Sequence, residues 1–130
     1  MSVSLLLDTN VVIWTLSTDN KISTRARRAM SRAPVELSVS IVSVWEIVLK
    51  YQTGKLRFEA AFKEVADKIL YESDWNILPM SPEHLSALAA LPMMHKDPFD
   101  RMLVAQARHE GLTILTPDEQ IRKYDVPTLW

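Results

Sequence analysis

Leu5-Leu6-Leu7-Asp8-Thr9-Asn10 is an apolar run, near the start of the printed sequence, that stops abruptly at an acid. A short apolar run with such a boundary predicts a buried strand, here over Val3–Leu7. A second apolar stretch follows at once and predicts a short helix over Thr9–Leu16. A carboxylate at the end of a buried strand is an unusual choice for stability alone, so this stretch indicates a functional acid at Asp8.

Short apolar strands alternate with helices along the rest of the chain. Further strands are predicted over Val35–Ile41, Trp75–Leu78, Leu112–Leu115 and Val126–Trp130. Helices are predicted over Thr24–Ala33, Val42–Thr53 and Phe58–Glu72, and then from Ser81 to about Leu91, Pro98 to Gly111 and Thr116 to about Lys123. This alternation predicts a three-layer α/β/α domain around a mostly parallel sheet of four to five strands. The carboxyl ends of such strands share one edge, where ligands bind.

The composition is that of a compact globular chain. Its 130 residues are 48% hydrophobic and suit one domain over 1–130 with a core of its own. Cysteine is absent, which excludes disulfides, thiolate metal sites and cysteine nucleophiles and is compatible with the cytoplasm, where we expect the protein. No stretch is long and uncharged enough to span a bilayer, so we expect no membrane partner.

The charge balance speaks against a simple nucleic-acid-binding module. A formal net charge of −1 provides no overall electrostatic attraction to DNA or RNA. A nuclease is less affected by this argument, because its acidic site lowers the net charge and can engage phosphate through metal. Basic residues do cluster at Arg25, Arg27, Arg28 and Arg32, but a solvated helix face explains them better than a nucleic-acid patch.

Four acids, which we call the acidic quartet, lie at predicted strand ends or helix starts: Asp8, Glu46, Asp100 and Asp118. A single sheet would bring several of them to one edge. Two like charges about 4 Å apart repel by roughly 4 kcal/mol at an effective dielectric near 20, so a gathered quartet needs cations or protons. Oxygen-only ligands suit Mg²⁺ or Mn²⁺, and such a site favours phosphodiester hydrolysis.

Each member of the quartet also has an ordinary structural explanation. Asp8 could cap the helix that follows it, and Asp118 stands in a turn sequence where aspartate is common. Glu46 alone would more often be a surface acid. Asp97 and Asp100 have the spacing of a capping box. However, Asp100 falls on an inward-facing apolar stripe of its helix, where a lone acid is costly.

The order of these segments resembles the PIN-domain family. Leu5–Asn10 is similar to the first acidic motif of that family, and Ser40–Glu46 to the second. His95–Ala107 resembles the third motif and Leu115–Asp118 the fourth. The resemblance extends along essentially the whole chain, including Val126–Trp130, and points most directly to the VapC-type toxins of bacterial toxin–antitoxin pairs.

The resemblance implies an endoribonuclease toxin that hydrolyses RNA with Mg²⁺ or Mn²⁺. It assigns the acidic quartet to catalysis and metal binding, with Asp8 and Asp100 as the direct ligands. Asn10 and Thr116 match polar positions beside the acids and would orient ligands or water. A homodimer is also implied, together with inhibition by a small cognate antitoxin that binds promoter DNA.

Some alternatives stay open within this interpretation. Asp97 could share the third motif with Asp100, although the residues after Asp100 continue the family's helical pattern. His95, Lys96 and Arg101 lie beside it and could contact phosphate, and for His95 a plain surface-loop residue is the simpler interpretation. Partner-binding apolar surface is also possible, although the four tryptophans are more simply explained as core.

Two other function classes compete with the ribonuclease. One is a non-catalytic interaction domain whose acids are only helix caps. The other is a different metal-dependent phosphate hydrolase. A phosphatase of the haloacid-dehalogenase type would need a second aspartate two residues after Asp8, where this chain has Asn10.

Overall fold

The computed structural model describes residues 3–17, 21–32 and 34–130. Within these residues the chain forms one five-stranded, fully parallel sheet in the order β3-β2-β1-β4-β5. The strands are β1 (Val3–Leu7), β2 (Val35–Ser40), β3 (Asn76–Leu78), β4 (Thr113–Leu115) and β5 (Thr128–Leu129). All five predicted strands are therefore confirmed, four of them with shorter ends than predicted.

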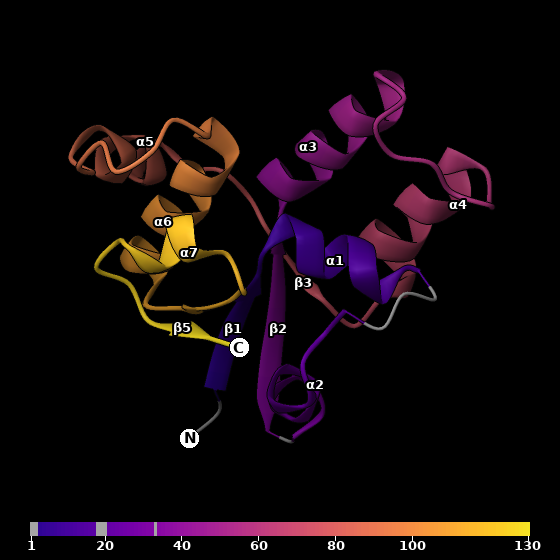
Figure 1. The fold of residues 1–130 in the computed structure, drawn as a ribbon, viewed down its shortest axis with the longest axis horizontal. Helices are drawn as coiled ribbons and strands as arrows, with labels where there is room; N and C mark the ends of the chain where they lie inside the picture. The colour runs from indigo at the N-terminus through magenta and orange to yellow at the C-terminus, as the bar shows by residue number, and fades with distance from the viewer. Residues whose placement is uncertain (1–2, 18–20, 33) are drawn as a thin grey trace.

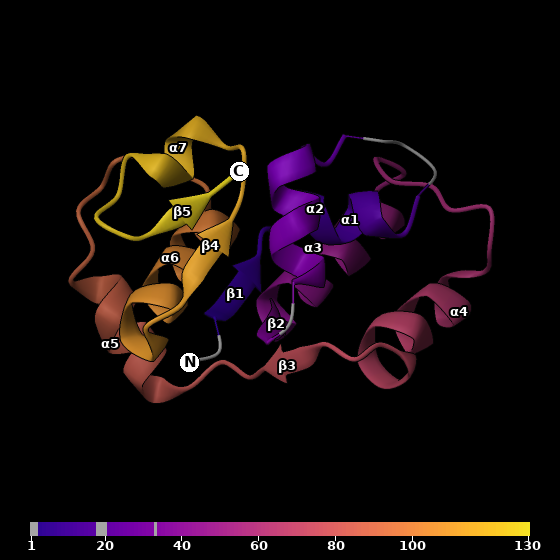
Figure 2. The same cartoon turned by 90° about the horizontal axis from the view of Figure 1, so that it is seen from below.

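Helices lie on both sides of this sheet, as two views related by a turn of 90° show (Figures 1 and 2). They are α1 (Thr9–Thr15), α2 (Thr24–Ser31), α3 (Ile41–Gln52), α4 (Phe62–Asp67), α5 (Pro82–Ala89), α6 (Pro98–Glu110) and α7 (Glu119–Arg122). The predicted three-layer α/β fold is confirmed. Ala33, the predicted end of the second helix, lies outside the described residues. None of the helices described is long and apolar enough to cross a membrane.

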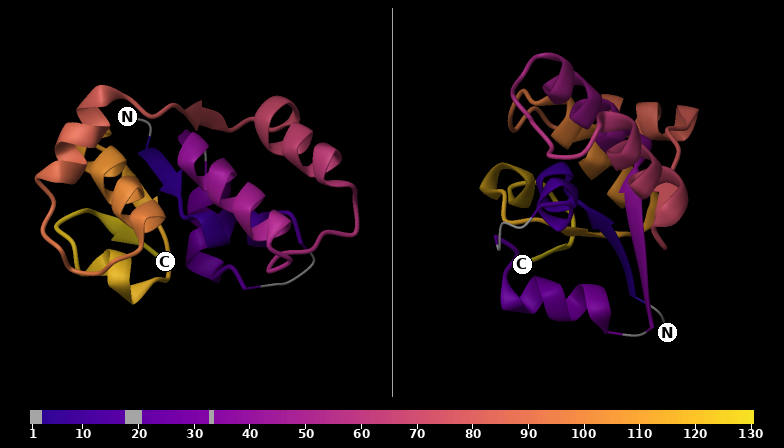
Figure 3. Two further views of the ribbon diagram at one scale, coloured as in Figure 1. Left: turned by 90° about the horizontal axis from the view of Figure 1, so that it is seen from above. Right: turned by 90° about the vertical axis from the view of Figure 1, so that its right-hand side faces the viewer.

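β1 is the middle strand of the sheet and is buried on both faces. Leu6 packs in a cluster with residues of α5, α6 and α7, whereas Leu7 packs in a second cluster with residues of α1, α2, α3 and α4. Successive side chains of a strand point to opposite faces, so the two leucines serve the two layers. Figures 2 and 3 show β1 between these two groups of helices. This double burial explains why the strand is a continuous apolar run.

The helix ends follow the sequence signals. Ser23 caps α2 by accepting from the Ala26 N–H, and Asp97 caps α6 by accepting from the N–H groups of Phe99 and Asp100. Gly111 ends α6 with a φ of 71°, the left-handed conformation that glycine adopts without strain.

The long helix predicted over Phe58–Glu72 is wrong in its first part. The helix begins at Phe62 and continues after Asp67 as a π-helical turn, η1 (Lys68–Glu72). Phe58 precedes the helix in irregular backbone, and its ring lies near that of Phe62 with centroids 6.5 Å apart. Glu59 and Ala60 form a bend between them, so the helix predicted from the local pattern does not extend through these residues.

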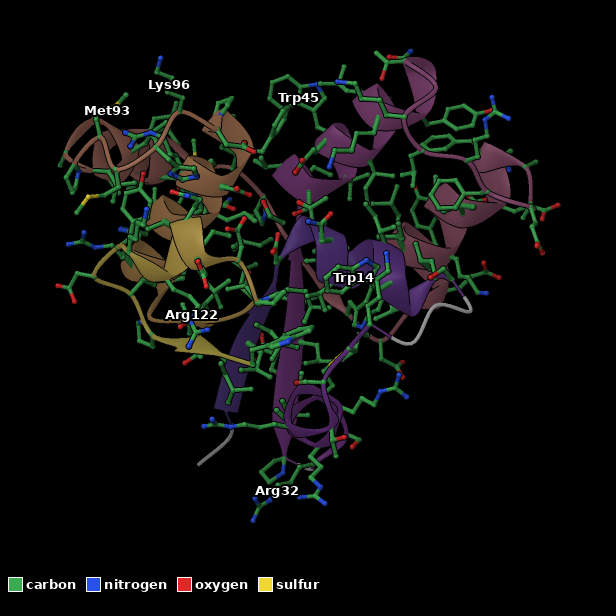
Figure 4. All side chains as sticks on the ribbon, in the orientation of Figure 1. Trp14, Arg32, Trp45, Met93, Lys96 and Arg122 are labelled. Carbon is green, nitrogen blue, oxygen red and sulfur yellow. The ribbon has the colours of Figure 1, made fainter. Side chains whose placement is uncertain are left out.

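α3 carries a stripe of exposed apolar side chains, Ile41, Trp45 and Leu49, spaced four residues apart. Trp45 is 55% exposed, so the interpretation of every tryptophan as core is wrong for this residue. Figure 4 shows it at the top of the molecule, beside the start of α6. The basic cluster is at the opposite end: its four arginines are exposed, and Arg32 lies where β2 begins.

Candidate functional site

The pairing of β1 with β4 places Asp8 beside Thr116. Leu7 is paired with Leu115, and the Asp8 N–H donates to the Leu115 carbonyl at 3.1 Å. One residue past the strands, the Thr116 hydroxyl donates to the Asp8 Oδ2 at 2.7 Å. Both residues are almost completely buried. The carboxylate predicted at the end of the central strand therefore lies inside the molecule with a dedicated hydrogen-bond donor.

Asp8 is not a helix cap in the usual sense. It occupies the position before α1, but its carboxylate accepts no capping hydrogen bond from that helix. The Asn10 backbone N–H nevertheless lowers the pKa of Asp8, although by less than the Thr116 hydroxyl does. The Asn10 side chain is exposed, at the surface beside the buried acid. Capping therefore does not explain the main contact of the Asp8 carboxylate, which is with the Thr116 hydroxyl.

Asp118 combines a structural contact with its place near Asp8. Its N–H donates to the Thr116 hydroxyl at 3.0 Å, which makes Thr116 the link between the two acids. Its Oδ1 accepts from the Gln120 N–H at 2.8 Å and so caps α7. The turn explanation is correct for this one carboxylate oxygen.

Glu46 is buried on α3, not exposed on the surface. Its Oε2 pairs with Lys50 Nζ at 3.1 Å, one helical turn further on. Its Oε1 is buried and has no hydrogen-bond partner among the described residues. A hydrogen bond of 2.8 Å from the Thr9 hydroxyl to the Ser43 hydroxyl fixes α3 against α1 near this acid. Sequence reasoning did not identify this contact.

Asp100 points inward from the first turn of α6, as its helical stripe predicted. The apolar members of that stripe are all buried: Leu103, Val104 and Ala107. Asp97 caps the helix, and the reciprocal bond that would make Asp100 part of a capping box is not found in the described structure. Asp97 and Asp100 therefore divide the roles that the sequence left open, with Asp100 as the buried acid.

The charges of other quartet members raise the pKa values of Asp8 and Asp100. The pKa of Asp100 is raised to about 8, mainly by burial and then by the charges of Asp8, Asp97, Asp118 and Glu46 in that order. The pKa of Asp8 is raised to about 6, mainly by burial and against the lowering effect of the Thr116 hydrogen bond. The charges of Asp118 and Glu46 add to this increase. The four carboxylates thus face a common region in which negative charge is poorly compensated.

This region contains the oxygen ligands that a divalent-cation site needs, but its described side chains are not arranged to enclose a cation. No group of three or more histidine or acidic side chains in the described residues stands ready to enclose a metal ion. The donors are nevertheless all carboxylate oxygens, which hard cations prefer. The unpartnered Glu46 Oε1 and the raised pKa values of Asp8 and Asp100 both indicate missing positive charge. These residues fit Mg²⁺ or Mn²⁺, provided that the side chains move inward around it.

The suggested phosphate contacts next to Asp100 need correction. Arg101 is buried and donates to the Pro92 carbonyl at 2.8 Å and to the Tyr124 hydroxyl at 3.0 Å, so it is not free for phosphate. The His95 side chain is only 12% exposed and contacts Tyr124, so the surface-loop interpretation is wrong. Lys96 is exposed and lies at the periphery (Figure 4).

A pocket of about 640 Å³ lies away from the acidic quartet. It is formed by the end of α1, the segment before α4, and α4 with η1. Its apolar wall includes Leu16, Phe58 and Val65, and it contains no member of the quartet. This pocket and the acidic site are therefore separate features.

Comparisons with known proteins agree with the fold of this chain. The family model of the PIN domain matches residues 5–127. Ribonuclease VapC22 of Mycobacterium tuberculosis (strain ATCC 25618 / H37Rv) is 26% identical over 131 residues, which cover 98% of each protein. A chain of VapBC2 from Rickettsia felis, crystallised with a DNA fragment from the promoter, superposes with a TM-score of 0.70 at 15% identity over 97% of both chains. A toxin–antitoxin complex from Klebsiella pneumoniae gives 0.68 at 18% identity, over 97% of this chain and 96% of the other.

We predict that the metal-free protein becomes less stable as the pH rises from 5 to 8. Asp8 and Asp100 have raised pKa values, so the folded state keeps protons that the unfolded chain has already released. The free energy of unfolding therefore falls as the pH passes the folded values of about 6 and about 8. Urea denaturation in EDTA would measure the change.

The variant Asp100→Asn should flatten this pH dependence, because the amide cannot ionise. It should be more stable than the unaltered protein at pH 8, and each 1 kcal/mol gained would raise the Tm by about 4 °C in a chain of this size. Asp74→Asn, at an exposed carboxylate, is the matched control and should follow the unaltered protein. An Asp100→Asn variant that is less stable at pH 8 would contradict the interpretation.

Proposed function

We propose that this chain, which belongs to the PIN domain family, is a metal-dependent endoribonuclease and the toxin of a toxin–antitoxin pair. The observation that supports the proposal is the acidic quartet beyond the carboxyl ends of the strands, three of whose members are buried. Burial, together with the charges of the other acids, raises the pKa values of Asp8 and Asp100. The ribonuclease named among its relatives supports RNA as the substrate. The toxin–antitoxin complex among the similar structures supports a cognate antitoxin as the partner.

In this proposal the chain's own residues hold and orient the reacting groups. Asp8 and Asp100 are the direct ligands of Mg²⁺ or Mn²⁺, and Glu46 and Asp118 complete the negative region. When bound, the cation would lower the pKa of a water molecule and offset the charge that builds up on the phosphate. The Thr116 hydroxyl fixes the rotamer of Asp8 through its 2.7 Å hydrogen bond. The exposed Asn10 is available to orient water or RNA at the entrance.

The competing function classes have less support. A non-catalytic domain explains its acids as caps, but only Asp118 of the quartet caps a helix through its side chain. A phosphatase of the haloacid-dehalogenase type lacks its second aspartate, since position 10 is Asn10. An endoribonuclease accounts for the burial of Asp8, Glu46 and Asp100 together.

Two further properties belong to the proposal. We propose a homodimer, for which the exposed stripe of Ile41, Trp45 and Leu49 on α3 offers an apolar contact surface. We also propose that the protein acts in the cytoplasm, where its RNA substrate and antitoxin would be found.

We predict that Asp8→Asn and Asp100→Asn each abolish RNA cleavage in Mn²⁺. Loss of a residue that only supports a metal ligand typically costs 10–100-fold, so loss of a ligand should lower the rate by at least about 100-fold. Cleavage of a single-stranded RNA, the DNA of the same sequence and p-nitrophenyl phosphate would be compared. Asp74→Asn should retain full activity. Full RNA cleavage by the double variant, or preference for the phosphomonoester, would refute the proposed reaction.

Metal binding itself predicts a rise in Tm with Mn²⁺ concentration. A ligand that binds only the folded state stabilises it by about 2.7 kcal/mol at a concentration 100 times its Kd. EDTA should reverse the rise, and the Asp8→Asn, Asp100→Asn double variant should not show it. An unchanged Tm at millimolar Mn²⁺ would favour the non-catalytic domain instead.

The dimer predicts a mass near twice 14.9 kDa in size-exclusion chromatography with light scattering. The measurement should be made over a range of concentrations, because a weak dimer dissociates on dilution. A single monomer mass at every concentration would remove the homodimer from the proposal and leave the ribonuclease untouched.

A further inference from the structure

A chain of buried hydrogen bonds leads to Asp100 from the loop before α6. Arg101 Nη1 donates to the Pro92 carbonyl at 2.8 Å and to the Tyr124 hydroxyl at 3.0 Å. The Tyr124 hydroxyl contacts His95 Nδ1 at 2.8 Å. On the other side of the same ring, His95 Nε2 lies 3.5 Å from Asp100 Oδ2. The imidazole therefore stands between a fixed tyrosine and the buried acid.

The donors in this chain determine where the His95 proton lies. A guanidinium only donates, so the Tyr124 oxygen is the acceptor for Arg101. With one lone pair of its oxygen occupied by Arg101, the Tyr124 hydroxyl is favoured as the donor to His95 Nδ1, which then acts as the acceptor. A neutral imidazole with Nδ1 as the acceptor carries its proton on Nε2, facing Asp100.

His95 Nε2 is without a hydrogen-bond partner among the described residues. The atom is buried and makes no hydrogen bond there, since 3.5 Å to Asp100 is too long for a well-formed one. Buried polar atoms are normally satisfied, so an orphaned donor needs an explanation. A small rotation of the Asp100 carboxylate would close the contact, as happens when a site tightens around its ligand.

The position of the ring is rigidly defined. Its centroid lies 5.4 Å from that of the Tyr124 ring, at an interplanar angle of 60°. Arg101 holds the backbone from which the His95 loop starts, through the carbonyls of Leu91 and Pro92. Both contacts restrict His95 to the orientation that faces Asp100.

We propose that His95 is a positioning residue for Asp100. When the 3.5 Å contact closes, its Nε2–H would hold Oδ2 of the carboxylate and leave the other oxygen of Asp100 available to a divalent cation. This proposal rests on the proposed function in one respect, that Asp100 is a metal ligand. The donors Arg101 and Tyr124 act behind His95 by fixing its tautomer.

The tautomer can be tested without metal or RNA. In metal-free protein at a pH above the Asp100 pKa of about 8, so that this carboxyl is ionised, ¹⁵N NMR should show His95 protonated at Nε2 and unprotonated at Nδ1. Tyr124→Phe removes the hydroxyl and keeps the ring, so it should allow the other tautomer to appear. A proton on Nδ1 in the unaltered protein would overturn the proposal.

The positioning role can be tested by calorimetric titration with Mn²⁺ alone. His95→Leu should weaken the Mn²⁺ Kd by about 10-fold, the lower end of the effect of residues that support metal ligands. His95→Gln, whose amide can donate from a similar place, should recover most of the affinity. Met94→Leu, at an exposed neighbouring position, is the control and should bind as the unaltered protein does.

A double variant separates positioning from general damage to the fold. In the Asp100→Asn background, His95→Leu should cause no further loss of Mn²⁺ affinity, because its target is gone. Equal Mn²⁺ affinity of His95→Leu and the unaltered protein would overturn the positioning role. Absence of Mn²⁺ binding by the unaltered protein would instead overturn the proposed function, and the NMR experiment would still decide the orientation of His95.

Discussion

The hydrogen bond from Thr116 to Asp8 joins the fold to the site. Asp8 follows the middle strand of the sheet, where both faces are covered and water is excluded. A carboxylate in that place needs a partner, and the pairing of β1 with β4 supplies one from a residue 108 positions away. Thr116 also accepts from Asp118, so the register of two strands sets the positions of two acids at once. A shift of that register would leave Asp8 buried without its donor.

Structural and chemical roles are divided between neighbouring residues along the chain. Asp97 satisfies the start of α6, which leaves Asp100 free to carry an uncompensated charge. Lys50 neutralises one oxygen of Glu46 and leaves the other without a partner. Asp97 thus accepts hydrogen bonds from backbone N–H groups, and Lys50 neutralises part of the negative charge. The remaining oxygens are those that the fold itself does not use.

The sequence predicted the features that depend on local order. Apolar runs located the strands, and Ser23, Asp97 and Gly111 located helix ends, because a strand period or a cap involves only nearby residues. Parallel topology predicted that the carboxyl ends of the strands, and the acids beside them, share one edge of the sheet. The contacts that refine the site are different: Thr9 meets Ser43 and His95 meets Tyr124 across long separations, and neither pair forms a periodic pattern. Arg101 suggested a phosphate contact by its charge alone, yet backbone carbonyls occupy it.

The raised pKa of Asp100 would also influence how long the protein persists in a cell. A molecule with neither a proton nor a cation at this buried carboxyl is the least stable form, and proteases act on unfolded chains. Protons and cations exchange much faster than chains are degraded, so all molecules share one average stability. A bound cation would therefore slow the turnover of the whole population, whereas its removal at a pH above the raised pKa of Asp100 would speed it.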